Sequence, residues 1–108
     1  MKLAMQWAAL WGVALVACGG SPIPQPTAAD ARRGAAHFPD LTLAELERGR
    51  SLYVSRCGSC HTLKRPAELA PHQWEREVTA MREENGVKLS DTEAQAIVRY
   101  LTVAATAG

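Results

Sequence analysis

The chain has 108 residues, which is enough for one small domain. Its charge is nearly balanced, with 12 Lys and Arg against 11 Asp and Glu. This balance gives no sign of the strongly basic surface that nucleic-acid-binding proteins use, so no nucleic-acid partner is expected. Hydrophobic patterning and a few reactive residues are left as the guides to function.

The first 17 residues have the pattern of an export signal. Lys2 is followed by a run of about 15 almost wholly apolar residues, which ends in small residues. These features describe a secretory signal peptide, and the run is shorter than the ~20 residues that a membrane-spanning helix needs. Residues 1–17 are therefore predicted to be a signal peptide, and the rest of the chain is expected outside the cytoplasm.

The end of this signal, Leu15-Val16-Ala17-Cys18-Gly19, resembles the bacterial lipoprotein signal. The resemblance implies that the Cys18 thiol is acylated and that the peptide bond before it is cut. The alternative is an ordinary signal peptide that happens to contain a cysteine. The chain has 3 cysteines, and an exported protein with an odd thiol needs an explanation. If Cys18 carries lipid, the protein is anchored on the periplasmic or cell-surface side of a bacterial membrane.

Residues 18–40 are rich in Gly, Ala and Pro, with prolines at positions 22, 24, 26 and 39. Alternating prolines disfavour helix, and such a segment has little apolar surface to bury. The composition predicts a flexible linker between the lipid and the folded domain. A short helix over residues 28–36 is the alternative.

Residues 41–106 are predicted to form an all-α domain of three main helices. Thr42-Leu43-Ala44-Glu45 is a capping box that starts the first helix, with Leu41 and Leu46 placed for a hydrophobic staple. The second helix is expected from His72 to Asn85 and stops at Gly86. The third begins at Ser90, and its apolar face consists of Ala94, Ile97, Val98 and Leu101. No run alternates for long enough to predict a strand.

Cys57, Cys60 and His61 form a C-x-x-C-H motif after the first predicted helix. Two cysteines three apart lie on one side of a helical turn, where both sulfurs can form thioethers with one porphyrin while the adjacent imidazole binds its iron. A thioredoxin-like dithiol would follow a strand, and a zinc site needs four ligands, for which only His37 and His72 remain. The motif thus predicts one covalently bound haem c, with His61 as an iron ligand.

The sequence from Gly49 to His61, GRSLYVSRCGSCH, resembles the first helix of cytochrome c domains. Ile97-Val98-Arg99-Tyr100-Leu101 resembles the last helix of the same family. The resemblance covers residue 41 to about residue 105 and implies a small bundle around the haem. It also implies that the two helices cross at Gly49, which lacks a side chain and lets backbones approach.

Electron-carrying members of that family usually place a methionine opposite the histidine, and Met81 is the only methionine after the signal peptide. It shares a helix face with Trp74 and Val78 at i, i+4 and i+7. His72 is the rival ligand. Met81 lies nine residues after His72, which is about two and a half turns of a regular helix. The two side chains would then point to opposite sides of the helix, and only one could reach the iron. Trp74 is expected to pack on the haem or to bond near a propionate, or else to be an ordinary core residue.

Together these features predict a lipid-anchored monohaem cytochrome that passes single electrons between redox partner proteins and is not itself an enzyme. One alternative is a haem with an open or labile sixth site that senses O₂, CO or NO or reduces peroxide. Another is a haem subunit of a larger oxidoreductase. Basic residues near the motif would either steer an acidic partner or belong to a mixed, solvated surface; they are Arg48, Arg50, Arg56, Lys64 and Arg65.

Overall fold

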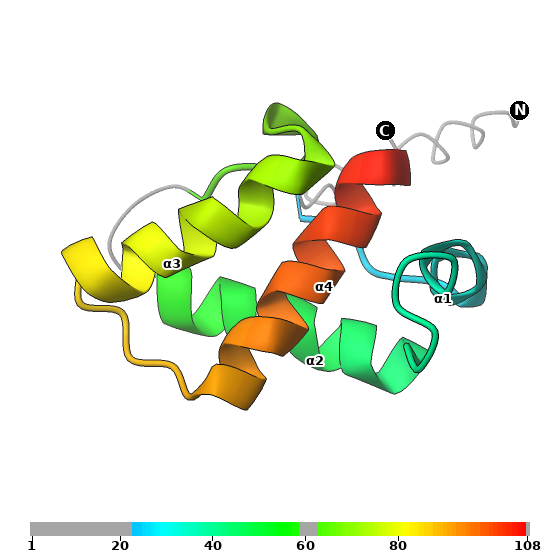
Figure 1. Cartoon of the computed structure of the whole chain (residues 1–108), viewed down its shortest axis with the longest axis horizontal. Coiled ribbons are helices and arrows are strands. Elements are labelled where there is room, and N and C mark those ends of the chain that lie inside the picture. The colour runs from blue at the N-terminus through cyan, green and yellow to red at the C-terminus, as the bar shows by residue number, and fades with distance from the viewer. Residues whose placement is uncertain (1–22, 59–62, 108) are drawn as a thin grey trace, which may run out of the picture.

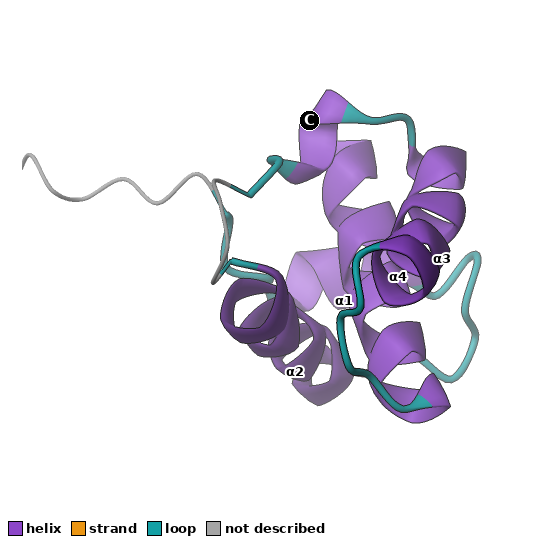
Figure 2. Cartoon of the chain, turned by 90° about the vertical axis from the view of Figure 1, so that its left-hand side faces the viewer, coloured by secondary structure: helices purple, strands orange, loops and turns teal. Residues whose placement is uncertain are grey.

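A computed structural model describes residues 23–58 and 63–107. Its four α-helices are α1 (Ala28–Gly34), α2 (Leu43–Leu52), α3 (Trp74–Glu84) and α4 (Asp91–Ala107). Within the described ranges there is no strand (Figure 2), which confirms the all-α prediction. Figure 1 shows α4 crossing α2, with α3 toward one end of the molecule and α1 at the other. The predicted signal peptide and the predicted roles of Cys18, Cys60 and His61 lie outside the described residues.

Helix α2 begins as the sequence predicts. The Thr42 hydroxyl oxygen accepts a hydrogen bond from the Glu45 backbone N–H at 3.1 Å, and Leu41 and Leu46 are both buried. The reciprocal half of the predicted capping box does not form. The Glu45 carboxylate instead accepts a hydrogen bond from the Arg99 guanidinium at 2.9 Å, which ties the start of α2 to α4.

The crossing of α2 and α4 forms the centre of the core, and Gly49 lies at the contact. A Cβ atom added to Gly49 would overlap the Ala96 carbonyl oxygen and would lie only 2.8 Å from the Tyr100 Cβ. The two backbones therefore approach as closely as a glycine permits. This confirms the crossing that the family resemblance implies.

Helix α3 begins two residues later than predicted. Pro71–Gln73 forms a 3₁₀ turn, η5, which leads directly into the helix at Trp74. The end is as predicted: Gly86 has a φ of 70°, a left-handed conformation that favours glycine. The Val87 N–H then donates to the Met81 carbonyl at 3.1 Å and closes the C-terminus of the helix.

Helix α4 is more deeply buried than its predicted face suggests. Its capping box forms in both directions, because Ser90 Oγ accepts from the Glu93 N–H at 3.0 Å and Glu93 accepts from the Ser90 N–H at 2.9 Å. The predicted residues Ala94, Ile97 and Leu101 are buried, and Val98 is partly buried. A second set is also buried because α4 contacts α1, α2 and α3; it comprises Ala96, Tyr100 and Val103.

The prediction of a flexible linker is wrong for residues 23–40. Ile23 is only 4% exposed, and its carbonyl accepts two hydrogen bonds from the Arg50 guanidinium, at 2.9 and 3.1 Å. A short helix, the alternative prediction for residues 28–36, forms instead as α1. The reason is local: Thr27 and Asp30 make a reciprocal capping box that starts α1, and the prolines before it keep the chain extended without preventing it from packing.

None of the described helices has the combined length and apolar character that crossing a bilayer requires.

Candidate haem-binding site

Cys57 lies at the end of a π-helical turn, η3 (Tyr53–Cys57), that continues α2. π-Helical turns are rare in proteins, and many of those that occur lie at functional sites. Tyr53 and Cys57 both point into the core, where they are 1% and 6% exposed. Cys57, the first predicted haem-attachment residue, therefore lies on a helical extension of α2 with its side chain buried.

The Cys57 thiol has an apolar environment within the hydrophobic core. Burial raises the pKa of Cys57, and the neighbouring Arg56 opposes that shift without cancelling it. The thiol is therefore held in its neutral form around neutral pH. It forms no disulfide with any residue that the structure describes.

Two buried aromatic residues fix the chain on either side of the motif. Trp74 and Tyr53 meet edge to face, with ring centroids 6.0 Å apart and planes at 79°. The Trp74 Nε1–H donates to the Pro66 carbonyl at 2.9 Å, and the Tyr53 hydroxyl donates to the Lys64 carbonyl at 2.8 Å. Both bonds hold the segment that returns from the motif against α2 and α3. The sequence patterns did not reveal them, because a carbonyl acceptor has no sequence signature.

These contacts favour packing over a propionate hydrogen bond as the role of Trp74. Its side chain is completely buried, and its single N–H is already paired with Pro66. A hydrogen bond from this indole to a haem propionate would break that pair. Packing of the ring is what remains for Trp74, whether against protein or against a cofactor.

Met81 and His72 differ in their surroundings. Met81 is partly buried and packs against the core on the α3 face that carries Trp74 and Val78, as the spacing predicts. His72 is exposed on the η5 turn. It lines a cavity of about 530 Å³ between α3 and α4, and Cys57 is not part of the lining of that cavity.

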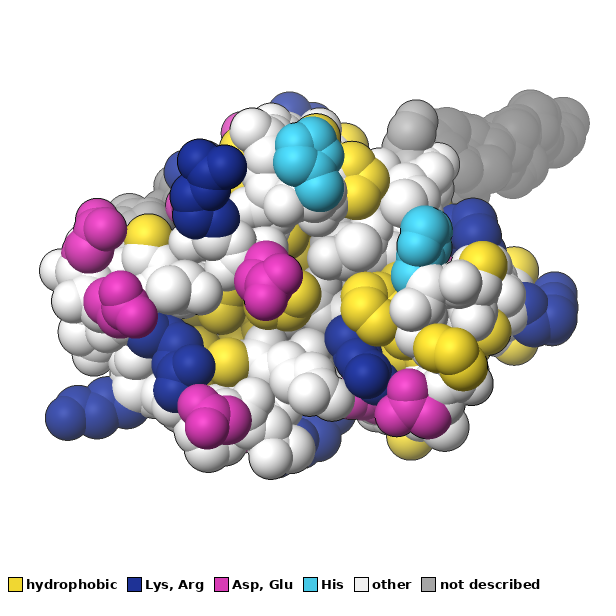
Figure 3. All heavy atoms as spheres, in the orientation of Figure 1, with side chains coloured by type: hydrophobic (Ala, Val, Ile, Leu, Met, Phe, Trp, Pro, Cys, Tyr) yellow, Lys and Arg dark blue, Asp and Glu magenta, His cyan; other side chains and the backbone are white. Residues whose placement is uncertain are grey.

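A larger cavity of about 730 Å³ lies beside the end of η3. Its walls are Arg56, the second half of α3, residues 86–90 and the first turn of α4. Its volume falls within the range of pockets that hold small molecules and cofactors. Figure 3 shows hydrophobic side chains at the bottom of the recesses on this side, with charged residues at their rims.

Arg56 bridges the rim of this larger cavity. Its guanidinium lies 3.0 Å from the Glu93 carboxylate and donates to the Lys88 carbonyl at 2.9 Å. The pKa of Glu93 is lowered, first by the hydrogen bond from the Ser90 N–H and then by Arg56. The Arg56–Glu93 pair therefore joins the residue before Cys57 to the start of α4.

Replacing Glu93 with glutamine is expected to weaken the acid dependence of stability. Because folding lowers the Glu93 pKa, its carboxylate stabilises the fold above its ordinary pKa of 4.5, and this contribution disappears as the pH falls through the lowered value. Urea unfolding of wild type and Glu93→Gln at pH 7 and at about pH 3.5 measures the difference. Glu84→Gln is the matched control, since Glu84 makes no ion pair within the described part of the chain. Equal acid sensitivity in wild type and Glu93→Gln would contradict the prediction.

The basic residues around the motif are mostly paired with acids or carbonyls. Arg56 bonds to Glu93, Lys64 lies 3.5 Å from Glu77, and Arg65 lies 3.3 Å from Glu68. Arg50 is engaged with Ile23, whereas Arg48 has no ion pair or hydrogen bond to any residue that the structure describes. Acidic and basic side chains also alternate across the face in Figure 3. The structure thus favours a mixed, solvated surface over a basic docking patch.

Comparison with known families matches residues 44–101 to the family described as cytochrome c oxidase, cbb3-type, subunit III. The matched residues make up just over half of the 108-residue chain, from the start of α2 into α4, and include Cys57, Cys60 and His61. The chain belongs to this family of c-type cytochrome domains. No curated protein and no solved structure matches it. Membership confirms the predicted cytochrome c resemblance, and it establishes covalently bound haem c as the cofactor and electron transfer as the general function.

The described residues of this c-type cytochrome fit that cofactor. Cys57 presents its thiol to an apolar core, as a thioether link to a porphyrin edge requires. The larger cavity is lined by the adjacent Arg56, whereas Cys57 and Met81 are not among its lining residues. Partly buried apolar side chains also pack against the core that contains Cys57; they include Leu52, Leu63, Met81, Val87 and Leu89.

Proposed function

We propose that this c-type cytochrome is a monohaem electron carrier attached to a membrane by lipid at Cys18. In this proposal Cys57 and Cys60 hold the haem through two thioethers, and His61 and Met81 are the axial iron ligands. The haem supplies an iron that takes up and releases one electron at a time. Because His61 and Met81 would both bind the iron, no substrate would need to bind it, and the protein itself would catalyse no reaction.

The observation that carries the proposal is the position of Cys57. It is the first residue of the C-x-x-C-H motif, it lies inside the family match, and it is buried at the end of a helical segment that crosses α4 at Gly49. The motif therefore begins next to the buried crossing of α2 and α4. Rigid attachment suits a carrier, because a cofactor that moves little costs little reorganisation when its charge changes.

Burial supports Met81 over His72 as the second iron ligand. A thioether in a partly buried position suits a site from which water is excluded, and Met81 has that position on the core side of α3. His72 is exposed and lines the cavity between α3 and α4, whose lining does not include Cys57. A methionine ligand would also raise the reduction potential relative to a second histidine.

Redox-titrated optical spectra of wild type, Met81→Ala and His72→Ala test this assignment. Met81→Ala is expected to change the spectrum and to shift the potential sharply, because the iron would lose a ligand. His72→Ala is expected to match wild type and serves as the control. An unchanged spectrum in Met81→Ala would contradict the assignment. If the reduced wild type binds CO without displacing a ligand, the sensing or peroxide-reducing alternative is favoured instead.

Lipid attachment at Cys18 is supported by the signal sequence and by the cysteine count, since no thiol is then left over. Labelling with radioactive palmitate in a bacterial host tests it. Wild type is expected to take up label and to fractionate with membranes, whereas Cys18→Ala is expected to do neither. Unlabelled wild type would indicate the ordinary signal peptide.

The partners we propose are redox proteins on the exported side of the same membrane. The family is described as a subunit of cytochrome c oxidase, which supports a second candidate: a haem subunit bound permanently to a larger oxidoreductase. Purification from membranes in mild detergent distinguishes the two. A free carrier is recovered alone, whereas a subunit is recovered at a fixed ratio with larger chains.

A further inference from the structure

The segment before α2 is bound to the domain as tightly as a core element. Ile23 is buried and receives two hydrogen bonds from Arg50, while the Tyr100 hydroxyl donates to the Pro24 carbonyl at 2.5 Å. Burial raises the pKa of Tyr100 to about 12, so this donor keeps its proton at physiological pH. The extended residues 23–26 are thus held by both crossing helices.

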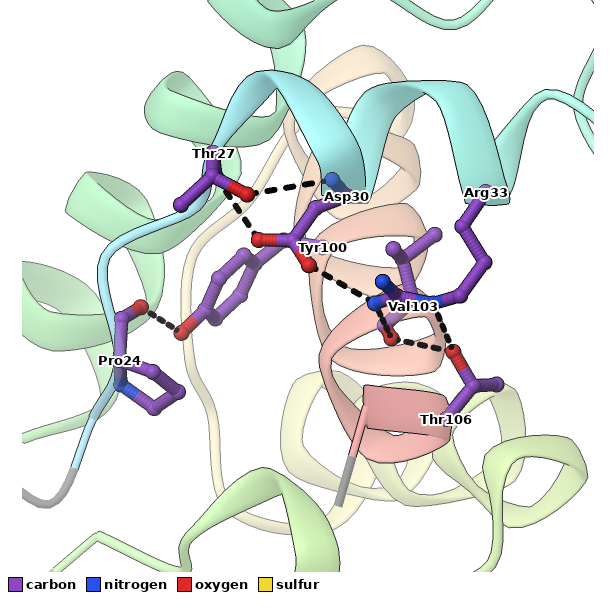
Figure 4. A network of polar contacts seen from close by, with 7 residues as sticks. All are labelled: Pro24, Thr27, Asp30, Arg33, Tyr100, Val103 and Thr106. Carbon is purple, nitrogen blue, oxygen red and sulfur yellow. Dashed lines mark hydrogen bonds and ion pairs between the residues drawn. The ribbon is translucent and has the colours of Figure 1, made fainter.

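Helix α1 continues the same attachment along α4. Figure 4 shows Arg33 reaching from α1 to the C-terminal part of α4, where it donates to the Val103 carbonyl at 3.1 Å and to the Thr106 hydroxyl at 3.0 Å. Gly34 is buried, and a Cβ added there would lie 2.6 Å from side-chain atoms of Leu41 and Val103. Residues 23–36, which we call the clasp, therefore bind the side of the crossing opposite to α3.

The clasp limits how far the domain can move from a lipid at Cys18. Five residue steps separate Cys18 from Ile23, and a fully extended chain of that length spans at most ~18 Å. Free chain from Cys18 to Leu41 would span up to ~80 Å. Docking of the clasp thus removes most of the reach that a flexible linker would provide.

The clasp also fixes which part of the domain lies nearest to the anchor. Arg50 holds the start of the clasp, and Cys57 lies seven residues further along the same helical segment, about 10 Å at the rise of an α-helix. The motif is therefore a short, set distance from the point where the chain departs toward Cys18.

We infer that the clasp holds the haem domain against the lipid surface, with its Ile23 end facing the bilayer. The inference rests on the proposed lipid at Cys18 for the membrane and on the described contacts for the clasp. The partner of this face is a phospholipid surface. The clasp keeps the connection between the lipid and the domain short.

Hydrogen exchange of the full chain tests the clasp itself. Amides of residues 28–36 are expected to exchange slower than an unstructured peptide by on the order of tenfold or more. Arg50→Met combined with Tyr100→Phe is expected to lose that protection while α3 keeps its own. Arg48→Met is the matched control, because Arg48 lies on α2 without a partner among the described residues. Exchange of residues 28–36 in wild type at the unstructured rate would overturn the inference.

The membrane placement is tested with the lipidated protein in vesicles of phosphatidylethanolamine and phosphatidylglycerol that carry a headgroup fluorophore. Quenching of the fluorophore by the haem is expected to be strong in wild type and several-fold weaker after a 20-residue Gly-Ser insertion behind Ser21. Equal quenching in the two proteins would overturn the placement. Wild type that fails to stay with the vesicles would contradict the lipid at Cys18, and hydrogen exchange would still decide the clasp.

Discussion

Replacing Cys57 and Cys60 together with alanine is expected to abolish covalent haem attachment completely. Both thioether sulfurs would be gone, and His61 alone would bind haem only reversibly. After denaturing electrophoresis, wild type should stain for haem peroxidase activity and the double variant should not. Cys18→Ala is the matched control, because it removes the third cysteine without touching the motif, and it should stain like wild type.

Haem staining of the double variant would contradict the assignment of these cysteines and would require another covalent link. The single variant Cys57→Ala keeps one possible thioether and is expected to stain less than wild type. The folded protein should also lose stability with its cofactor. Only 13 hydrophobic residues are buried in the described part of the chain, and small domains with so few depend on additional cross-links.

The second large effect is expected for Gly49→Ala. In an exposed helix this change would stabilise by about 1 kcal/mol, because alanine is the better helix former. At Gly49 the new methyl group would overlap the Ala96 carbonyl and press on the Tyr100 side chain. Overpacking of this kind costs about 1–3 kcal/mol, and here the obstacle is backbone, which yields less than a side chain. A net loss is therefore expected.

Urea unfolding followed by circular dichroism measures the loss, and Gly86→Ala separates sterics from backbone strain. Nothing lies within 4 Å of a Cβ added at Gly86, but its φ of 70° disfavours alanine, at a cost of about 1–2 kcal/mol. Both variants should unfold at a lower urea concentration than wild type, Gly49→Ala through the steric overlap and Gly86→Ala through backbone strain alone. Equal or higher stability of Gly49→Ala relative to wild type would show that the two helices can separate without cost.

The sequence was most informative where structure is decided locally. The caps at Thr42 and Ser90 and the stop at Gly86 each depend on interactions within a few residues. The box at Ser90 and the stop at Gly86 form as predicted, whereas at Thr42 only the hydroxyl half of the predicted box forms. The crossing at Gly49 joins residues far apart in the chain, and only a family resemblance gave its location. Cys57 follows Gly49 and Tyr53 at i+4 steps, and this spacing places it on their buried helix face.

Contacts between distant residues with ordinary side chains could not be predicted. The clasp was predicted to be a linker because its proline-rich sequence has no apolar periodicity. The capping box of Thr27 and Asp30 is the local pattern that marks the start of α1. The acceptors that fix it, and the Pro66 carbonyl that holds Trp74, are backbone atoms. Every residue carries such an acceptor, so nothing in the sequence marks these particular ones.

The position of α4 also has a consequence for the order of folding. The Tyr100–Pro24 hydrogen bond joins residues 76 apart, and the crossing at Gly49 likewise needs the last helix. In the export that we propose, the C-x-x-C-H motif would emerge before α4, so the cysteines would still be accessible while the final core is missing. Closing such long loops is slow. We therefore expect haem attachment to precede core formation. Packing of α4 would then bury the cofactor and bind the N-terminal segment in one late step.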